Sequence, residues 1–229
     1  VQADQVLMRL DDAVAKANYA DVRQGYFALL AAQGRLIAEQ QGHPKVEFAP
    51  ELLEAAKQDA QLQLQLQNQT QLFSARRAQL QADIQSLKEG VAGQRALQQS
   101  YKSIEQNRQA QLALLQQELT PLRELVQEGY APHNRQRELE RQQADIRSAL
   151  ADLQGNALRT TSSIAELQQR IVSRQQEYRK EVETQLADVN RQVLAEGERY
   201  RAVSNDLQRT EIRSPASGQV VGLAVQTEG

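Results

Sequence analysis

The sequence predicts a mainly α-helical protein in which a long antiparallel two-helix coiled-coil hairpin and a shorter third helix lie between two short β segments. Three observations point to this fold. Ala, Gln and Leu make up about two-fifths of the 229 residues, a composition typical of long helices. Aromatic residues are only 4% and Trp is absent, which leaves few large rings for a compact core. The two longest helical segments are nearly equal in length and meet at one short turn.

The two ends of the chain have strand-like patterns. Residues 1–11 contain a short alternation of apolar side chains, which predicts one part of a small β module. Residues 209–229 contain two β-rich runs separated by a turn at Pro215 and Gly218, which predicts the other part. Because both ends stop within strand-like sequence and the first residue is Val1, we expect the chain to be a fragment of a longer protein.

Residues 12–208 form the predicted helical domain. Its first helix covers about residues 12–41, where apolar residues recur at alternating spacings of four and three, the pattern of a coiled-coil seam. The tripeptide Gly42-His43-Pro44 ends this helix, because proline disfavours helical geometry in the residue before it.

The second predicted helix covers about residues 51–128. Its four-three spacing is unbroken from Leu80 to Val126. Seam positions in its middle, among them Gln94 and Arg108, are polar, so this stretch is predicted to be the loosest part of the seam.

In one segment of that helix, the spacing of the apolar residues is ambiguous between helix and strand. Residues 61–71 alternate Gln and Leu with period two, which favours a strand, whereas the helical flanks and the propensity of both residues favour a helix. We choose the helix. Leu62 and Leu64 then point to nearly opposite sides, so we expect neighbours on both sides of this stretch.

The third predicted helix covers about residues 133–208, after a tip near residues 129–132. Its apolar seam runs from Leu139 to Ile171, shifts register near Tyr178, and continues through Val182 and Leu186. A turn this short makes neighbouring helices antiparallel. The second and third helices therefore form a hairpin that brings the two β ends together.

The tip is the predicted partner-binding site. Val126 continues the seam and closes the coiled coil, whereas Leu125 and Tyr130 fall off the seam and are expected to be exposed. Exposed apolar side chains at an extremity suggest contact with a partner, although closure of the coiled coil alone is the simpler alternative. The predicted site comprises Leu125, Val126, Gly129, Tyr130, Ala131, Pro132 and Asn134.

Composition argues against catalysis and against nucleic acid. The chain has no Cys, and its two histidines, His43 and His133, lie in predicted turns without nearby acidic clusters, so we expect no metal, no cofactor and no enzymatic activity. The net charge of −2 implies no nucleic-acid surface. A nucleic-acid-binding or structural coiled-coil arm of a larger protein remains the alternative; the nucleic-acid arm would require a basic tip.

The terminal segments carry a family resemblance. Arg209 to Gly222, RTEIRSPASGQVVG, resembles the second half of the lipoyl-like domain of the HlyD-family periplasmic adaptors, or membrane fusion proteins. Gln5 to Asp11, QVLMRLD, resembles the end of the first half, with Asp4 where the family usually has Gly. Neither segment contains the Lys that lipoylation needs. Within the family, the chain looks most like the adaptors of type I protease secretion, the PrtE and AprE type.

The resemblance implies a function and a set of partners. The β ends would be halves of a split lipoyl-like module into which the helical domain is inserted. The whole protein would be anchored in the inner membrane of a Gram-negative bacterium and would extend into the periplasm. It would bridge an inner-membrane ABC transporter and a TolC-like outer-membrane channel for type I protein secretion, as a ring of six copies.

The resemblance also bears on the tip. Many family members carry an Arg–Leu–Ser type motif there that touches the channel. Matching the motif to this chain places Leu125 on its Leu, Pro121 on its Arg and Pro132 on its Ser. The apolar contact therefore carries over and the two polar contacts do not.

Overall fold

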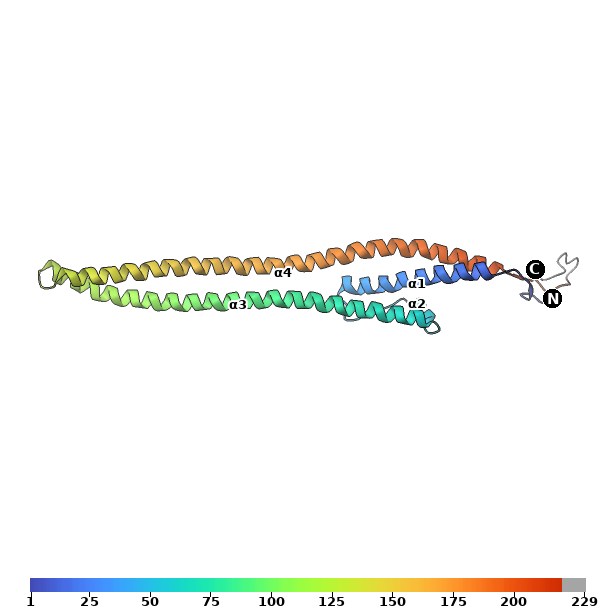
Figure 1. Cartoon of the computed structure of the whole chain (residues 1–229), viewed down its shortest axis with the longest axis horizontal. Helices are drawn as coiled ribbons and strands as arrows, with labels where there is room; N and C mark the ends of the chain where they lie inside the picture. Colours follow the sequence, from blue (N-terminus) through green and yellow to red (C-terminus); the bar gives the residue numbers. More distant parts are fainter. Residues whose placement is uncertain (220–229) are drawn as a thin grey trace. The chain divides into compact units, whose positions relative to one another are not determined.

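The computed structural model describes residues 1–219, and the predicted β-rich run from residue 220 onward lies outside them. The elements in chain order are β1 (Val6–Arg9), α1 (Ala13–Gln41), α2 (Pro50–Ala56), α3 (Ala60–Gln127), α4 (His133–Arg209) and β2 (Glu211–Arg213). Figure 1 shows these elements coloured along the chain. The chain divides into two compact units: the hairpin unit is Leu80–Gln176, and the base unit combines Val1–Gln79 with the described residues from Glu177 onward.

The hairpin unit consists of the antiparallel ends of α3 and α4. Residue numbers rise along one helix as they fall along the other, as two cross-helix contacts show: Asp83 with Arg174 at 3.0 Å, and Gln98 with Thr161 at 2.9 Å. Every buried apolar residue of this unit lies on the predicted seam: Val91, Leu115, Leu119, Val126 and Leu139. No residue of α3 between Val91 and Leu115 is fully buried, so the prediction of a loose, polar middle is confirmed.

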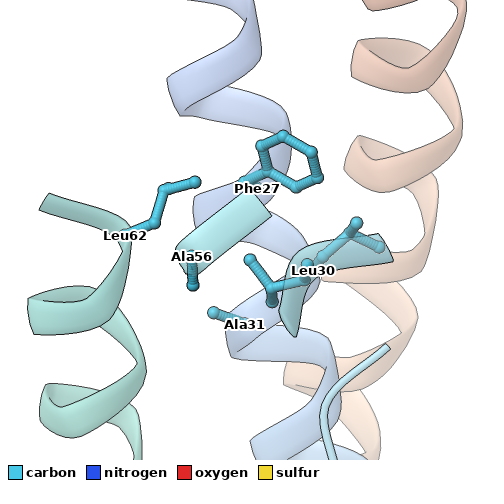
Figure 2. Close-up of a cluster of buried hydrophobic side chains, with 6 residues drawn as sticks. Phe27, Leu30, Ala31, Ala56 and Leu62 are labelled. Atoms are coloured by element: carbon cyan, nitrogen blue, oxygen red, sulfur yellow. The ribbon is translucent and has the colours of Figure 1, made fainter. Parts of the chain in front are cut away.

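The base unit packs α1 against α2, α3 and α4. One apolar cluster joins α1, α2 and the start of α3 (Figure 2) and consists of Phe27, Leu30, Ala31, Leu52, Ala56 and Leu62. A second cluster joins α1 to α4 and consists of Leu36, Val182 and Leu186. The α1 members of the first cluster, Phe27, Leu30 and Ala31, are spaced by three and four residues from Phe27, which places them along one face of the helix.

The predicted second helix is wrong at its start, because the structure divides it into α2 and α3. Residues 57–59 separate the two helices. The Asp59 carboxylate accepts hydrogen bonds from the backbone N–H groups of Gln61 and Leu62 at 3.0 and 3.2 Å, which is the geometry of a helix N-cap. Arg23 of α1 holds the same carboxylate at 2.8 Å. A new helix therefore begins at Ala60 without any Gly or Pro to mark it.

Replacing Asp59 with alanine should lower the free energy of unfolding by about 1–2 kcal/mol, because it removes both the cap and the partner of Arg23. The hydrogen bond from Arg23, together with those from the backbone, holds the pKa of Asp59 below its ordinary value. Its stabilisation is therefore complete above the ordinary aspartate pKa and is lost as pH falls through the lowered folded-state value. Urea denaturation of both proteins at several pH values measures the difference, and an equal free energy at neutral pH would contradict the capping role.

The expectation for Leu62 and Leu64 is half wrong. Leu62 is fully buried, as expected, but Leu64 is 56% exposed. The segment is helical, so the two side chains do diverge, and α1 and α2 cover only the side of Leu62. Leu64 has no covering neighbour in the part of the chain that the structure describes.

The two chain ends pair as a small antiparallel sheet. Val6 of β1 stands opposite Arg213 of β2, and Arg9 stands opposite Glu211. Asp4 precedes β1 with φ of +66°, in the left-handed region where glycine is usual and aspartate is tolerated. These two strands are all of the predicted β module that residues 1–219 contain.

None of the helices within residues 1–219 combines the length and the apolar character needed to cross a bilayer.

Candidate functional site

The tip of the hairpin unit is held by a helix-ending motif centred on Gly129. The Tyr130 N–H donates to the Leu125 carbonyl at 2.8 Å, and the Gly129 N–H donates to the Val126 carbonyl at 3.2 Å. Gly129 has φ of +79°, which only glycine adopts at little cost. This bond pattern is the Schellman motif, and it ends α3 and reverses the chain within a few residues.

The motif sorts the predicted site residues into exposed and buried groups. Leu125 is 45% exposed and Tyr130 is 80% exposed, so their predicted exposure is confirmed. Val126 is only 5% exposed and closes the seam. Ala131 is half-buried, and the remaining predicted residues, Gly129, Pro132 and Asn134, are exposed. The apolar surface of the tip is therefore concentrated on Leu125 and Tyr130, and contact with a partner stays a prediction.

A small apolar core lies next to the tip, between α3 and α4. Leu115 and Leu119 of α3 pack with Leu139 of α4. The helix continues through Pro121 to Gln127. Proline has no N–H to donate to the carbonyl oxygen four residues earlier. The apolar contacts of this core therefore help to stabilise the last turns of α3.

Ion pairs across the two helices neutralise the tip. Arg123 binds Glu140 at 2.9 Å and Arg135 binds Glu118 at 2.8 Å. The hydrogen bond from Gln136, followed by that from Arg123, holds the pKa of Glu140 below its ordinary value. Because both arginines pair with glutamates of the same hairpin, the tip lacks the basic surface that a nucleic-acid-binding arm requires.

The base unit contains a buried ionic network. The side chain of Glu39 is fully buried and lies 2.6 Å from Arg35 and 3.2 Å from Arg76. Arg76 also binds Glu181 at 3.0 Å, and Gln69 accepts a hydrogen bond from Arg35 at 2.8 Å. The network therefore ties α1 to α3 and α4. Its only local sequence signal is the four-residue spacing of Arg35 and Glu39.

An aromatic cluster secures the start of α1 on the end of α4. Tyr200 stacks on Tyr26 at 5.3 Å between ring centroids, and its hydroxyl lies 3.2 Å from that of Tyr19. Burial, followed by the hydrogen bond with Tyr19, raises the pKa of Tyr200 to about 12. The phenol therefore stays neutral at physiological pH and serves packing.

Within residues 1–219, no three His, Asp or Glu side chains come together in a way that could hold a metal ion.

Comparison with known proteins gives matches along almost the whole chain. Residues 15–206 match a family described as "AprE, long alpha-helical hairpin". The chain is 35% identical to the alkaline protease secretion protein AprE of Pseudomonas aeruginosa and 30% identical to the proteases secretion protein PrtE of Dickeya chrysanthemi, over 100% of its length in both cases. It covers 53% and 51% of those two proteins. The chain thus spans about half the length of these relatives.

A solved structure is similar in fold as well as in sequence. The crystal structure of the soluble domain of LipC, a membrane fusion protein of a type I secretion system, aligns with a TM-score of 0.89 at 34% identity. The alignment covers 98% of this chain and 84% of that structure.

Proposed function

Because the chain belongs to the AprE family of long α-helical hairpins, we propose that it is the periplasmic hairpin part of an adaptor in a type I protein secretion system. The adaptor bridges an ABC transporter in the inner membrane and a TolC-like channel in the outer membrane. Exported proteases are the proposed cargo, since two relatives are named for protease secretion.

The observation that carries this proposal is the match to the soluble domain of a type I secretion membrane fusion protein along nearly the whole chain. The sequence identity, above 30%, and the similarity in fold both support the adaptor function. The exposed Leu125 and Tyr130 at the tip add an apolar contact surface where a bridging protein needs one.

The rest of the proposed assembly lies beyond the described chain. We place the anchor in the inner membrane of a Gram-negative cell, and the hairpin in the periplasm. β1 and β2 supply two strands of a lipoyl-like module, because a sheet of two short strands needs further strands for stability. Six copies form a ring around the exported chain, and many weak contacts add up through multivalency.

In this proposal the chain has a structural role and catalyses no reaction. The long helices act as spacers, and the ionic network around Glu39 fixes the base from which they extend. Docking at the tip uses the apolar surface of Leu125 and Tyr130 and needs no cofactor.

A photoreactive amino acid at position 130 tests the proposal in cells that secrete the cargo. Tyr130 is the most exposed large apolar residue of the described chain, so the probe should not disturb packing. We expect ultraviolet light to link the full-length protein to an outer-membrane channel. The same probe at position 194, where Leu194 is 72% exposed in the base unit, should leave the channel free. Equal capture from both positions, or capture of nucleic acid from position 130, would contradict tip docking.

A further inference from the structure

One flank of the hairpin unit carries three exposed basic side chains of α3. We call them the basic flank: Lys88, Arg95 and Lys102. They are spaced by seven residues and each directly follows a seam residue, so they lie on one side of the helix, about 10 Å apart along its axis. Among the residues that the structure describes, none of the three has an ion-pair partner. The basic flank is therefore a line of uncompensated positive charge.

Nearer the tip, α4 neutralises a basic residue at the same position of the heptad. Arg123 also directly follows a seam residue, and it binds Glu140 at 2.9 Å. In an antiparallel pair, the positions equivalent to these two recur every seven residues, with numbers that fall along α3 and rise along α4. Three, four and five heptads away, the equivalent positions hold Lys102 and Thr161, Arg95 and Gln168, and Lys88 and Gln175. The hydrogen bond of 2.9 Å from Gln98, one turn from Lys102, to Thr161 supports this register.

α4 therefore offers a neutral side chain at each position where a glutamate would pair with the basic flank. The nearest acidic side chains of α3 have other partners. Glu89 accepts a hydrogen bond from Gln85 at 3.0 Å, and Glu105 accepts one from Gln109 at 3.3 Å. The charge of the basic flank is thus available to a molecule outside the described chain.

Acidic residues of α4 in this region lie on the opposite side of the helix. Each directly precedes a seam residue: Asp145, Asp152 and Glu166. Thr161 and Gln168 directly follow one, and two positions turn about 200° around a helix. Leu97 of α3, which is 41% exposed, is likewise two positions from Arg95. The two flanks of the hairpin therefore differ: one is basic, and the other carries acidic and apolar side chains.

We propose that the basic flank attracts acidic segments of the polypeptide that the system exports. This inference rests on the proposed function, in which the copies surround the exported chain. An extended chain rises about 10 Å in three residues, so acidic residues at that interval meet successive members of the basic flank. The basic flank thus matches an extended acidic polypeptide in both charge and spacing.

The strength of the contact also suits a chain that moves past it. Exposed ion pairs are weak one by one, whereas a row of like charges raises the local concentration of an oppositely charged molecule. The exported polypeptide is therefore drawn to the hairpin without being held there. Nucleic acid is the other extended polyanion, but three basic residues on a chain of net charge −2 give it a weak site.

A neutral variant and a swapped variant test the proposal in the full-length protein, produced with its transporter and channel. The neutral variant combines Lys88→Gln, Arg95→Gln and Lys102→Thr, and it should slow the export of a negatively charged cargo by at least about threefold. The swapped variant adds Gln175→Lys, Gln168→Arg and Thr161→Lys. These additions return the three charges to the same flank from α4, so the rate should recover. An unchanged rate in the neutral variant, or a swapped variant as slow as the neutral one, would overturn the proposal.

A third variant separates the charge of the flank from folding. Thr161→Glu, Gln168→Glu and Gln175→Glu give each basic residue the kind of partner that Glu140 is to Arg123, so thermal stability should not fall. Export should nevertheless slow as in the neutral variant, because the positive charge is now compensated within the hairpin. Export at the parental rate would overturn the proposal.

A photoreactive amino acid at position 99 locates the contact in secreting cells. Gln99 is exposed and lies one turn from Arg95. We expect ultraviolet light to link this position to the exported polypeptide, and to do so at least about fivefold less from position 97 on the other flank or in the neutral variant. Equal capture from positions 97 and 99, or capture of nucleic acid from position 99, would overturn the proposal.

The probes at positions 99 and 130 separate this inference from the proposed function. If position 130 captures the channel while position 99 captures no exported polypeptide, the adaptor function stands and the role of the basic flank is wrong. Capture of the exported polypeptide at position 99 without capture of the channel at position 130 would support the basic flank and remove the tip docking.

Discussion

Replacing both Leu125 and Tyr130 with aspartate should reduce secretion of the cargo by at least about tenfold, because apolar anchors of an interface typically contribute 2 kcal/mol or more each. The two side chains are 45% and 80% exposed, and the hydrogen bonds that hold the turn come from the backbone. The double variant should therefore keep its helicity and its abundance in the membrane.

Leu194→Asp is the matched control for this experiment. Leu194 is 72% exposed, so the same chemical change is made on the surface of the base unit, away from the tip. We expect secretion by this variant to stay within about twofold of the parent, since surface substitutions usually have small effects. Full secretion by the tip variant would show that the apolar tip is not the docking surface.

Replacing Glu39 with alanine should lower the free energy of unfolding by about 3–5 kcal/mol, the usual result of removing one partner from a buried ion pair. The Glu39 side chain is fully buried, and its loss leaves Arg35, whose side chain is 8% exposed, without its carboxylate at 2.6 Å. Arg76 loses a second contact at 3.2 Å. Urea denaturation followed by circular dichroism measures the change.

Glu166→Ala is a comparable change on the surface. Glu166 pairs with Arg170 at the same four-residue spacing, but both side chains are 63% exposed. Exposed pairs of this kind are worth about 0.3–0.5 kcal/mol. If Glu39→Ala and Glu166→Ala lower the free energy of unfolding equally, burial does not increase the contribution of Glu39 to stability.

The seam could be read from the sequence because helix pairing depends on a local, repeating pattern. The four-three spacing identified Leu119, Leu139, Val182 and Leu186 as inward-facing, and all four are buried. It also identified Leu125 and Tyr130 as off the seam, and both are exposed. A two-helix seam is specified by residues three and four apart, which the sequence displays directly.

Features that depend on contacts with a third helix could not be predicted from the spacing of apolar residues. Asp59 starts a helix with help from Arg23, which lies 36 residues earlier in the chain. Glu39 is buried because α3 and α4 bring Arg76 and Glu181 to it, whereas its own surroundings resemble any surface pair at four-residue spacing. Leu64 is exposed because the apolar cluster with α1 and α2 forms on the side of Leu62. Each of these outcomes depends on long-range contacts that leave no periodic signal.

The partner that contacts the tip could not be predicted from the spacing of apolar residues either. Exposure of Leu125 and Tyr130 follows from the seam, but what binds them depends on the shape and chemistry of another molecule.

We propose that this hairpin docks an outer-membrane channel through its tip. The most direct measurement is the equilibrium affinity of the purified full-length protein for the reconstituted channel, compared between the parent and the Leu125→Asp, Tyr130→Asp variant. We predict that the parent binds and that the variant binds at least about tenfold more weakly, a difference of 1.4 kcal/mol or more. Equal affinities for the channel would contradict the claim.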